Sequence, residues 1–134
     1  MRNLYILTIC LLCSLFAWAK PVDENKAKTV ATNFISGRAT HFQNGISAVT
    51  LSYTASGVVE QGAAADTRNY FYAFSINNGE GFVLIAADDQ VTPILAYSFE
   101  SAFDVTEMPE SVAKWLEGYK KEIRYVIEKD VPAT

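Results

Sequence analysis

Residues 69–87 read NYFYAFSINNGEGFVLIAA, two apolar runs separated by a short polar stretch. Asn and Gly at positions 77–80 tolerate positive φ, so this stretch predicts a tight turn between two antiparallel strands. The second run, 81–87, is apolar at nearly every position, which indicates a strand covered on both faces, or covered on one face and packed at an edge. Alternate residues of the first run are expected to share one face: Tyr70, Tyr72, Phe74 and Ile76. Such a row could form a ligand platform, but we expect it to be core beneath helices.

Two further strands are expected, one on either side of this hairpin. Val49 to Tyr53 alternates apolar and polar residues, and Pro93 to Tyr97 begins with a proline, which suits the start of a strand because it has no amide hydrogen. Ser56 to Asp66 is rich in Gly and Ala and predicts a mobile loop, and Ser98 to Pro109 has the character of a loop. Strands that follow one another without crossover helices form an antiparallel sheet, here of about four strands.

Amphipathic helices are predicted from Asp23 to Ser36 and from Pro109 to Lys129. Gly37 ends the first helix, and Pro109 suits the first turn of the second. The apolar positions of the first helix recur at three or four residues: Ala27, Val30, Ala31, Phe34 and Ile35. Those of the second form a continuous stripe: Val112, Trp115, Leu116, Tyr119, Ile123, Val126 and Ile127. We therefore expect a single α+β domain with both helices packed on one face of the sheet.

Residues 1–19 have the pattern of a secretory signal peptide. Arg2 gives a short basic start, an apolar run covers residues 4–16, and Ala17 and Ala19 are the small residues that a signal peptidase reads. The run is too short for a transmembrane anchor, which takes roughly 20 apolar residues. We expect cleavage after Ala19.

Cleavage there leaves Lys20 to Thr134 as a single mature domain, which we expect to be secreted or periplasmic. Cys10 and Cys13 depart with the signal, so the domain is expected to be held together by its core and not by disulfides. Loss of Arg2 leaves 10 basic residues against 15 acidic ones, without a basic stripe. This composition argues against nucleic-acid binding, and we expect no membrane contact after signal cleavage.

Residue types that carry catalysis or bind metals are sparse in this domain. Its one histidine, His41, lies in a predicted loop, where we expect it to be solvated. Asp88 and Asp89 suit either a metal or acid–base site, or a turn in which a side chain caps backbone amides, and we favour the turn. Zinc sites need clustered His or Cys ligands. We therefore expect no catalytic residues, no metal site, no cofactor and no enzymatic activity.

Several stretches together resemble a known family. Residues 27–34 read AKTVATNF, residues 81–89 read GFVLIAADD, residues 92–98 read TPILAYS, and residues 108–119 read MPESVAKWLEGY. This series is similar to the pro-domain of streptopain-type cysteine peptidases, which are bacterial and papain-like, and to the stand-alone inhibitors homologous to that pro-domain. The resemblance covers nearly the whole mature domain, and the Asp-Asp pair followed by Pro-Ile-Leu-Ala-Tyr-Ser is its most specific part.

The resemblance implies a small antiparallel sheet with helices, and a module that masks the active site of a papain-like cysteine peptidase of streptopain type. In the family, the segment from the last strand into the final helix lies against the enzyme near its catalytic histidine, and Phe99 to Ser111 matches it here. A polar residue at the start of the family's last helix reaches the active-site region. Ser111 stands at that place but is shorter than the usual asparagine, and Ala96 replaces a usual glycine.

We therefore expect a secreted inhibitor, monomeric when free, that blocks its peptidase by steric occlusion. The expected peptidase-binding residues are Phe99, Phe103, Glu110 and Ser111. Phe103 is equally compatible with packing of its loop on the core, and Met108 better suits a staple before the helix. The short tail after the final helix favours a free inhibitor over the first part of a longer precursor. Two other functions stay open: a folding helper for a peptidase, and a surface module that binds carbohydrate or host protein through Tyr70 and Tyr72.

Overall fold

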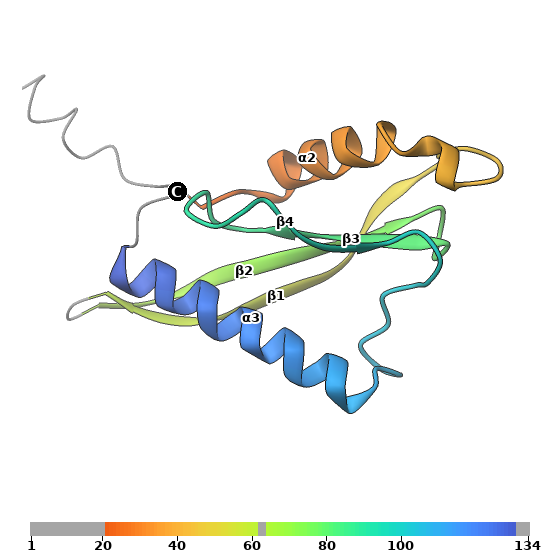
Figure 1. Cartoon of the computed structure of the whole chain (residues 1–134). Helices are drawn as coiled ribbons and strands as arrows, with labels where there is room; N and C mark the ends of the chain where they lie inside the picture. Colours follow the sequence, from red (N-terminus) through yellow and green to blue (C-terminus); the bar gives the residue numbers. More distant parts are fainter. Residues whose placement is uncertain (1–20, 62–63, 131–134) are drawn as a thin grey trace, which may run out of the picture.

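The computed structural model describes residues 21–61 and 64–130, so the predicted signal peptide and its two cysteines lie outside the described residues. One antiparallel sheet of four strands in the order β1-β2-β3-β4 carries a long helix on each side (Figure 1). The long elements are α2 (Glu24–Ser36), β1 (Val49–Gln61), β2 (Ala64–Ile76), β3 (Gly81–Ala86), β4 (Ile94–Ser98) and α3 (Glu110–Lys129). A short 3-10 helix, η1 (Ala39–His41), follows α2. The predicted α+β class and antiparallel sheet are confirmed.

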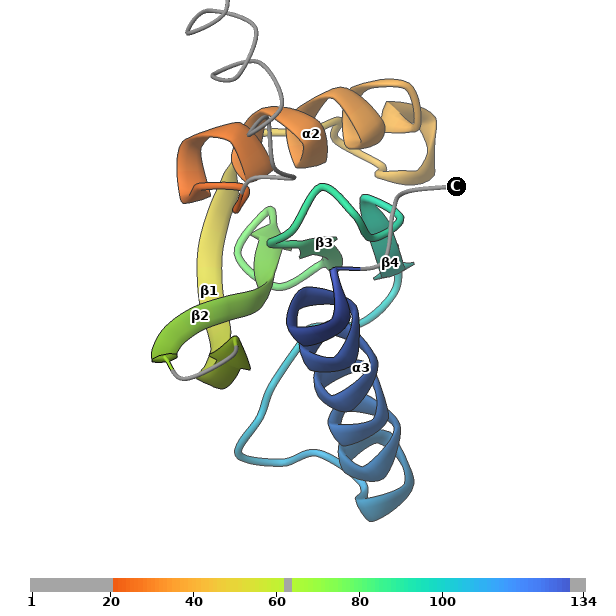
Figure 2. The ribbon, with the colours of Figure 1, turned by 90° about the vertical axis from the view of Figure 1, so that its left-hand side faces the viewer.

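The two helices lie on opposite faces of the sheet, so the prediction that both pack on one face is wrong (Figures 1 and 2). Successive side chains of a strand point to opposite faces. Val83 and Ile85 of β3 belong to the core cluster beneath α2, whereas Leu84 belongs to the cluster beneath α3. All three side chains are fully buried. A strand that is apolar on both faces needs a cover on each, as expected for β3, and one helix supplies each cover.

The hairpin between β2 and β3 has the predicted turn. Ile76 pairs with Gly81, and the turn residues Asn77, Asn78 and Gly79 all have positive φ, at 51°, 58° and 115°. The Asn77 carboxamide oxygen also accepts a hydrogen bond of 2.7 Å from the backbone amide of Ser47. The turn therefore anchors the loop that precedes β1.

The predicted mobile loop from Ser56 to Asp66 is wrong for the described residues, because most of it is strand. β1 and β2 continue as a long hairpin in which Val59 pairs with Asp66. Val59 is fully buried in the cluster beneath α3. The backbone amide of Glu60 donates a hydrogen bond of 3.1 Å to the side-chain oxygen of Glu128 on α3. Packing against α3 thus outweighs the weak strand propensity of Gly and Ala.

An irregularity in this hairpin changes the face of one tyrosine. The register of β1 and β2 passes from Ala55 opposite Phe71 to Ser56 opposite Asn69, which leaves Tyr70 out of the pairing. Tyr70 therefore joins the α3-side cluster together with Phe71, while Tyr72 and Phe74 join the α2-side cluster. The expectation that this row is core is confirmed, but the expectation of one shared face is wrong for Tyr70.

Both helices begin and end close to the predicted residues. The Asp23 side chain accepts a hydrogen bond of 2.7 Å from the amide of Lys26, which caps the first turn of α2, and Gly37 is its C-cap. α3 begins directly after Pro109 and ends at Lys129, and its C-cap residue Asp130 has the left-handed conformation. Within the described part of the chain, no helix has the length and apolarity needed to cross a membrane.

Candidate functional site

The connection from β4 to α3, residues 99–109, passes from one face of the sheet to the other. Phe99 packs with the α2-side cluster, where its ring centroid lies 4.5 Å from that of His41 and 5.6 Å from that of Phe42. Phe103 packs with the α3-side cluster, where its ring lies 5.8 Å from Tyr53 and 5.5 Å from Phe82. The structure therefore does not bring these two predicted binding residues into one patch. The two rings instead attach the connection to opposite faces of the sheet.

Gly81 makes the first of these attachments possible. A Cβ atom on Gly81 would lie 2.5 Å from the carbonyl oxygen of Ser98 and 3.2 Å from the Cα of Phe99. It would also lie 3.3 Å from the ring of Phe42. Only glycine allows the end of β4 to lie this close to the start of β3.

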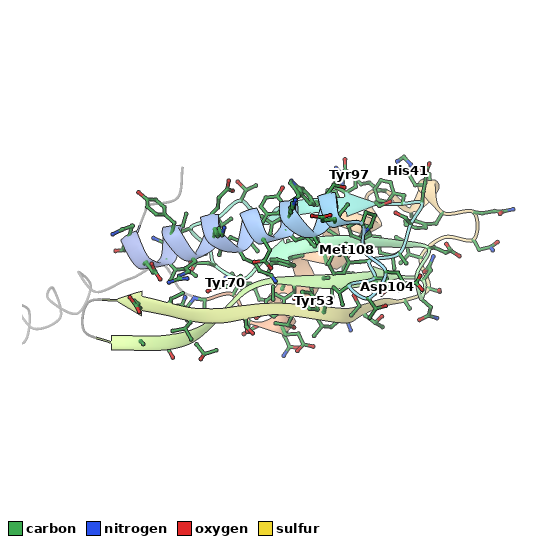
Figure 3. All side chains as sticks on the ribbon, turned by 90° about the horizontal axis from the view of Figure 1, so that it is seen from below. His41, Tyr53, Tyr70, Tyr97, Asp104 and Met108 are labelled. Atoms are coloured by element: carbon green, nitrogen blue, oxygen red, sulfur yellow. The ribbon has the colours of Figure 1, made fainter. Side chains whose placement is uncertain are left out.

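Between these attachments and α3 lies an exposed tip, residues 104–107. The Asp104 carboxylate accepts hydrogen bonds from the backbone amide of Thr106 at 2.8 Å and from its hydroxyl at 2.6 Å. These bonds hold the pKa of Asp104 below its ordinary value. Val105 is 47% exposed. Figure 3 shows Asp104 and Met108 toward the same end of the sheet as His41 and Tyr97.

The remaining predicted site residues lie at the start of α3. Glu110 and Ser111 are both exposed, and the Glu110 carboxylate forms an ion pair of 2.9 Å with Lys114 one turn later. Met108 is partly buried against the α3-side cluster, in keeping with the staple predicted for it. Phe99 and Phe103 are partly buried as well, so the core contacts that were the alternative for Phe103 are present. Their contact with a peptidase stays a prediction.

Two positions of the α3 stripe are more exposed than predicted. Val112 and Trp115 were expected to pack on the core, but they are 37% and 48% exposed, and the buried positions of α3 begin at Leu116. Trp115 packs edge-on against Tyr119, with ring centroids 4.6 Å apart. Periodicity alone could not separate these residues from the buried ones, because it gives the facing side of a helix but not how far the sheet extends beneath it.

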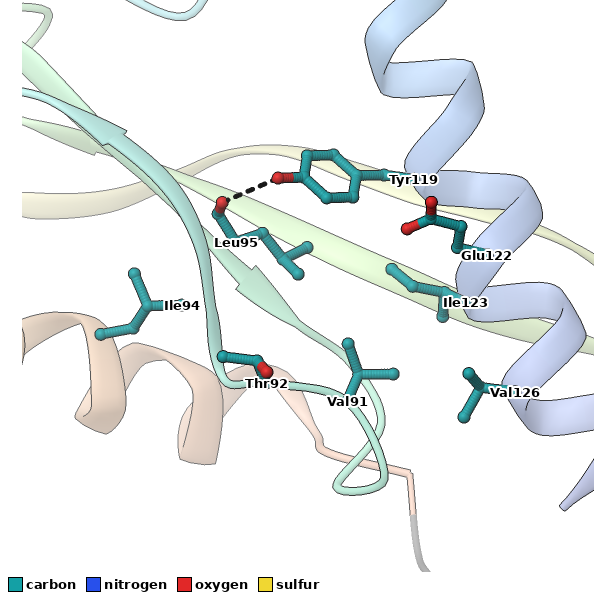
Figure 4. Close-up of a pocket in the computed structure, with 8 residues that line it drawn as sticks. All are labelled: Val91, Thr92, Ile94, Leu95, Tyr119, Glu122, Ile123 and Val126. Carbon is teal, nitrogen blue, oxygen red and sulfur yellow. Dashed lines mark hydrogen bonds between the residues drawn. The ribbon is translucent and has the colours of Figure 1, made fainter. Parts of the chain in front are cut away.

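A groove of about 340 Å³ lies between α3 and β4 (Figure 4). Its lining is mainly apolar, with Glu122 as the one charged residue: Val91, Thr92, Ile94, Leu95, Tyr119, Glu122, Ile123 and Val126. The hydroxyl of Tyr119 donates a hydrogen bond of 3.0 Å to the carbonyl oxygen of Leu95 across this groove. The sequence did not predict the groove, because its two sides are distant in the chain.

Asp88 closes a turn, as favoured from the sequence. One carboxylate oxygen accepts a hydrogen bond of 2.9 Å from the amide of Gln90, and the other forms an ion pair of 3.2 Å with Arg68. Asp88 is 2% exposed, and this burial raises its pKa, while the Gln90 amide and the Arg68 guanidinium act in the opposite direction. Among residues 21–61 and 64–130, no group of three or more His, Cys, Asp or Glu side chains is arranged to hold a metal ion.

Comparison with known proteins gives one family model and one curated relative. The family model described as Spi protease inhibitor matches residues 19–123 of this chain. A curated relative, the thiol protease/hemagglutinin PrtT of Porphyromonas gingivalis, is 34% identical over 127 residues. That match covers 95% of this chain and 14% of the relative, so the chain spans about one seventh of the relative's length. No solved structure matches the chain.

Proposed function

The chain belongs to the Spi protease inhibitor family, and from that premise we propose that it is a secreted, non-catalytic protein that binds a papain-like cysteine peptidase of streptopain type and occludes its active site. The family match supports the inhibitor class. The relative supports the class of target, because its name describes a thiol protease. The streptopain type of the target and the export of the chain rest on the sequence patterns.

The observation that carries this proposal is the connection 99–109, a segment without helix or strand that is nevertheless attached on both faces of the sheet. Phe99 holds it on the α2 side and Phe103 on the α3 side. A surface held in one conformation before binding loses little conformational entropy on association. The connection and the first turn of α3 thus present a preformed surface to an enzyme.

Phe99 and Phe103 act mainly as supports in this account, and Glu110 and Ser111 are the polar contacts. Both polar residues are exposed, and neither is needed for the core. Inhibition follows from steric occlusion: the bound domain keeps substrate away from the catalytic cysteine of the enzyme. No residue of the inhibitor needs to react.

The test is a titration. The protein, expressed with its own N-terminus and purified after export, is added to an active streptopain-type peptidase while hydrolysis of a small fluorogenic peptide is followed. The expected result is a stoichiometric loss of activity, with the protein recovered uncut. Unchanged activity at a large molar excess, or rapid digestion of the protein, would overturn the proposal.

A folding helper is a second candidate, because the identity to part of a thiol protease is also what a pro-domain would show. Refolding of a denatured peptidase with and without this chain separates the two functions, since a helper raises the yield of active enzyme. The third alternative, a surface site built on Tyr70 and Tyr72, is wrong: these rings are 5% and 3% exposed.

A further inference from the structure

The exposed tip, residues 104–107, is held as a turn at the centre of the surface assigned to the peptidase. We propose that this tip enters the substrate groove of the cysteine peptidase with Val105 as its apolar anchor, and that the turn closed by Asp104 keeps it bound without being cleaved. This inference rests on the proposed function. It adds which residue makes the central contact with the enzyme, and why the enzyme does not cleave the inhibitor there.

Core contacts fix the tip at both of its ends. Phe103 precedes it and its ring contacts those of Tyr53 and Phe82, and Met108 follows it and packs on the same cluster beneath α3. The two ends therefore belong to one rigid face of the molecule. An exposed loop with fixed ends can project into a groove without first having to become ordered.

Val105 is the apolar side chain that this tip offers. It is 47% exposed, between the exposed residues Asp104 and Thr106. A β-branched side chain has few rotamers to lose, so its burial in an apolar pocket costs little side-chain entropy. A few anchors of this kind carry most of the binding energy of an interface.

The charge around the tip indicates the charge expected at the rim of the enzyme groove. Asp104 and Glu107 belong to the tip, Glu110 follows within three residues, and all three carboxylates are exposed. Complementary charges on two partners raise their association rate, and this gain decreases as added salt screens the attraction. The partner that fits is a cysteine peptidase with an apolar subsite and basic residues at the rim of its substrate groove.

The turn explains how the tip can be presented to a peptidase and stay intact. Peptidases cleave chains that lie extended across the catalytic residues, and attack requires the nucleophile and the carbonyl carbon to meet at about 3–3.5 Å in the correct orientation. Here the backbone bends at residues 105–107, and Asp104 binds both the amide and the hydroxyl of Thr106. The carbonyls beside Val105 are held within a turn, away from an extended alignment.

The anchor is tested by comparing V105D with V58D in the full-length exported protein. Val58 is a matched control, because it is 54% exposed on β1 and lies outside the connection. V105D is expected to raise the inhibition constant by at least about tenfold, and V58D to leave it unchanged, with both melting temperatures near that of the unmodified protein. If the unmodified protein and V105D inhibit equally well, this inference is overturned but the proposed function is not. An unmodified protein that does not inhibit would overturn the proposed function, and the inference with it.

The turn is tested by incubating D104A with the peptidase and analysing the products by mass spectrometry. S101A serves as the control, since it removes a hydroxyl contact to Ser98 in the same connection but leaves the tip closed. D104A is expected to be hydrolysed between residues 104 and 108, with one water added across the broken peptide bond, and its inhibition is expected to decay with time. S101A is expected to stay uncut. Lasting inhibition by an uncut D104A would show that the turn does not protect the tip.

Discussion

The hydroxyl of Tyr119 on α3 donates a hydrogen bond of 3.0 Å to the carbonyl oxygen of Leu95 on β4. Leu95 is the residue that the pairing of β3 and β4 skips, because Leu84 lies opposite Ala96 and Ile85 lies opposite Ile94. An edge strand with such an irregularity exposes backbone groups that need partners. The tyrosine supplies one, and so joins the helix to the edge of the sheet from which the connection to α3 departs.

Removing this hydroxyl is expected to destabilise the fold. Tyr119→Phe leaves the ring in place but leaves the Leu95 carbonyl without this donor, at an expected cost of about 1 kcal/mol in the free energy of unfolding. Tyr125→Phe is the matched control, because Tyr125 lies on the same helix and is 59% exposed. Urea unfolding of both variants checks the prediction, and equal stabilities of the two would contradict it.

Two glycine substitutions are expected to have opposite effects. Gly81→Ala places a methyl group against the Ser98 carbonyl and the Phe99 backbone, so it should lower the free energy of unfolding by about 1–3 kcal/mol. Gly118→Ala lies within α3 with nothing within 4 Å of the added Cβ, and should raise it by about 0.5–1 kcal/mol. Denaturant unfolding measures both. A tolerated Gly81→Ala would mean that the connection is not set by this close approach.

Stability is expected to depend on pH through Asp88. Burial raises the pKa of this carboxyl above 3.8 in the folded state, so the folded protein binds its proton more tightly than the unfolded chain. The contribution of Asp88 to stability is therefore largest at pH values below 3.8 and falls as the pH rises through the folded-state pKa.

Asp88→Asn keeps an acceptor for the Gln90 amide and abolishes this titration. The stability of the unmodified protein relative to the Asn variant should be greatest below pH 3.8, decrease as the pH rises through the folded-state pKa, and level off above it, as measured by urea unfolding. Glu100→Gln, at an exposed position in the connection after β4, provides the comparison. A difference that increases with pH would contradict the assigned direction.

Binding and stability are expected to separate along the connection. Replacement of Glu110 and Ser111 together by Ala removes exposed side chains, so inhibition should weaken while the melting temperature stays nearly unchanged. Phe99→Ala removes a ring that packs on His41, Phe42 and Tyr97, so it should also lower the free energy of unfolding by about 1–3 kcal/mol. Thermal unfolding and inhibition assays on the same preparations make the comparison. An unchanged inhibition constant in the Glu110 and Ser111 variant would remove these residues from the site.

Local patterns predicted the central hairpin well. Asn77 and Gly79 specify a turn by their tolerance of positive φ, and the apolar run of β3 specifies burial on both faces. The same run also indicates that the two helices lie on opposite faces of the sheet, because burial of Val83 on one face and Leu84 on the other requires a covering layer on each. Which helix covers which face depends on contacts between distant segments, and periodicity carries no information about them.

The wrong predictions share a related physical cause. The strand at Val59 is stabilised by packing against α3, which lies more than fifty residues later in the chain. The local composition alone indicated a loop. The exposure of Trp115 depends on where the sheet ends beneath α3. In the candidate site, resemblance indicated the connection from Phe99 to Ser111, but which of its residues pack on the core and which are exposed depends on tertiary contacts with both faces of the sheet. The Asp104 turn is local, and Asp followed two residues later by Thr is a signal that sequence reasoning could have used.

The claim that the domain covers the active site is tested most directly by chemical labelling of the enzyme. The peptidase is saturated with the inhibitor, and its catalytic cysteine is then challenged with a small thiol-alkylating reagent. Labelling is expected to be much slower in the complex with the unmodified protein than in the free enzyme, and to return toward the free rate when V105D replaces the unmodified protein at the same concentration. A complex that forms while the catalytic cysteine is labelled at its free rate would contradict occlusion.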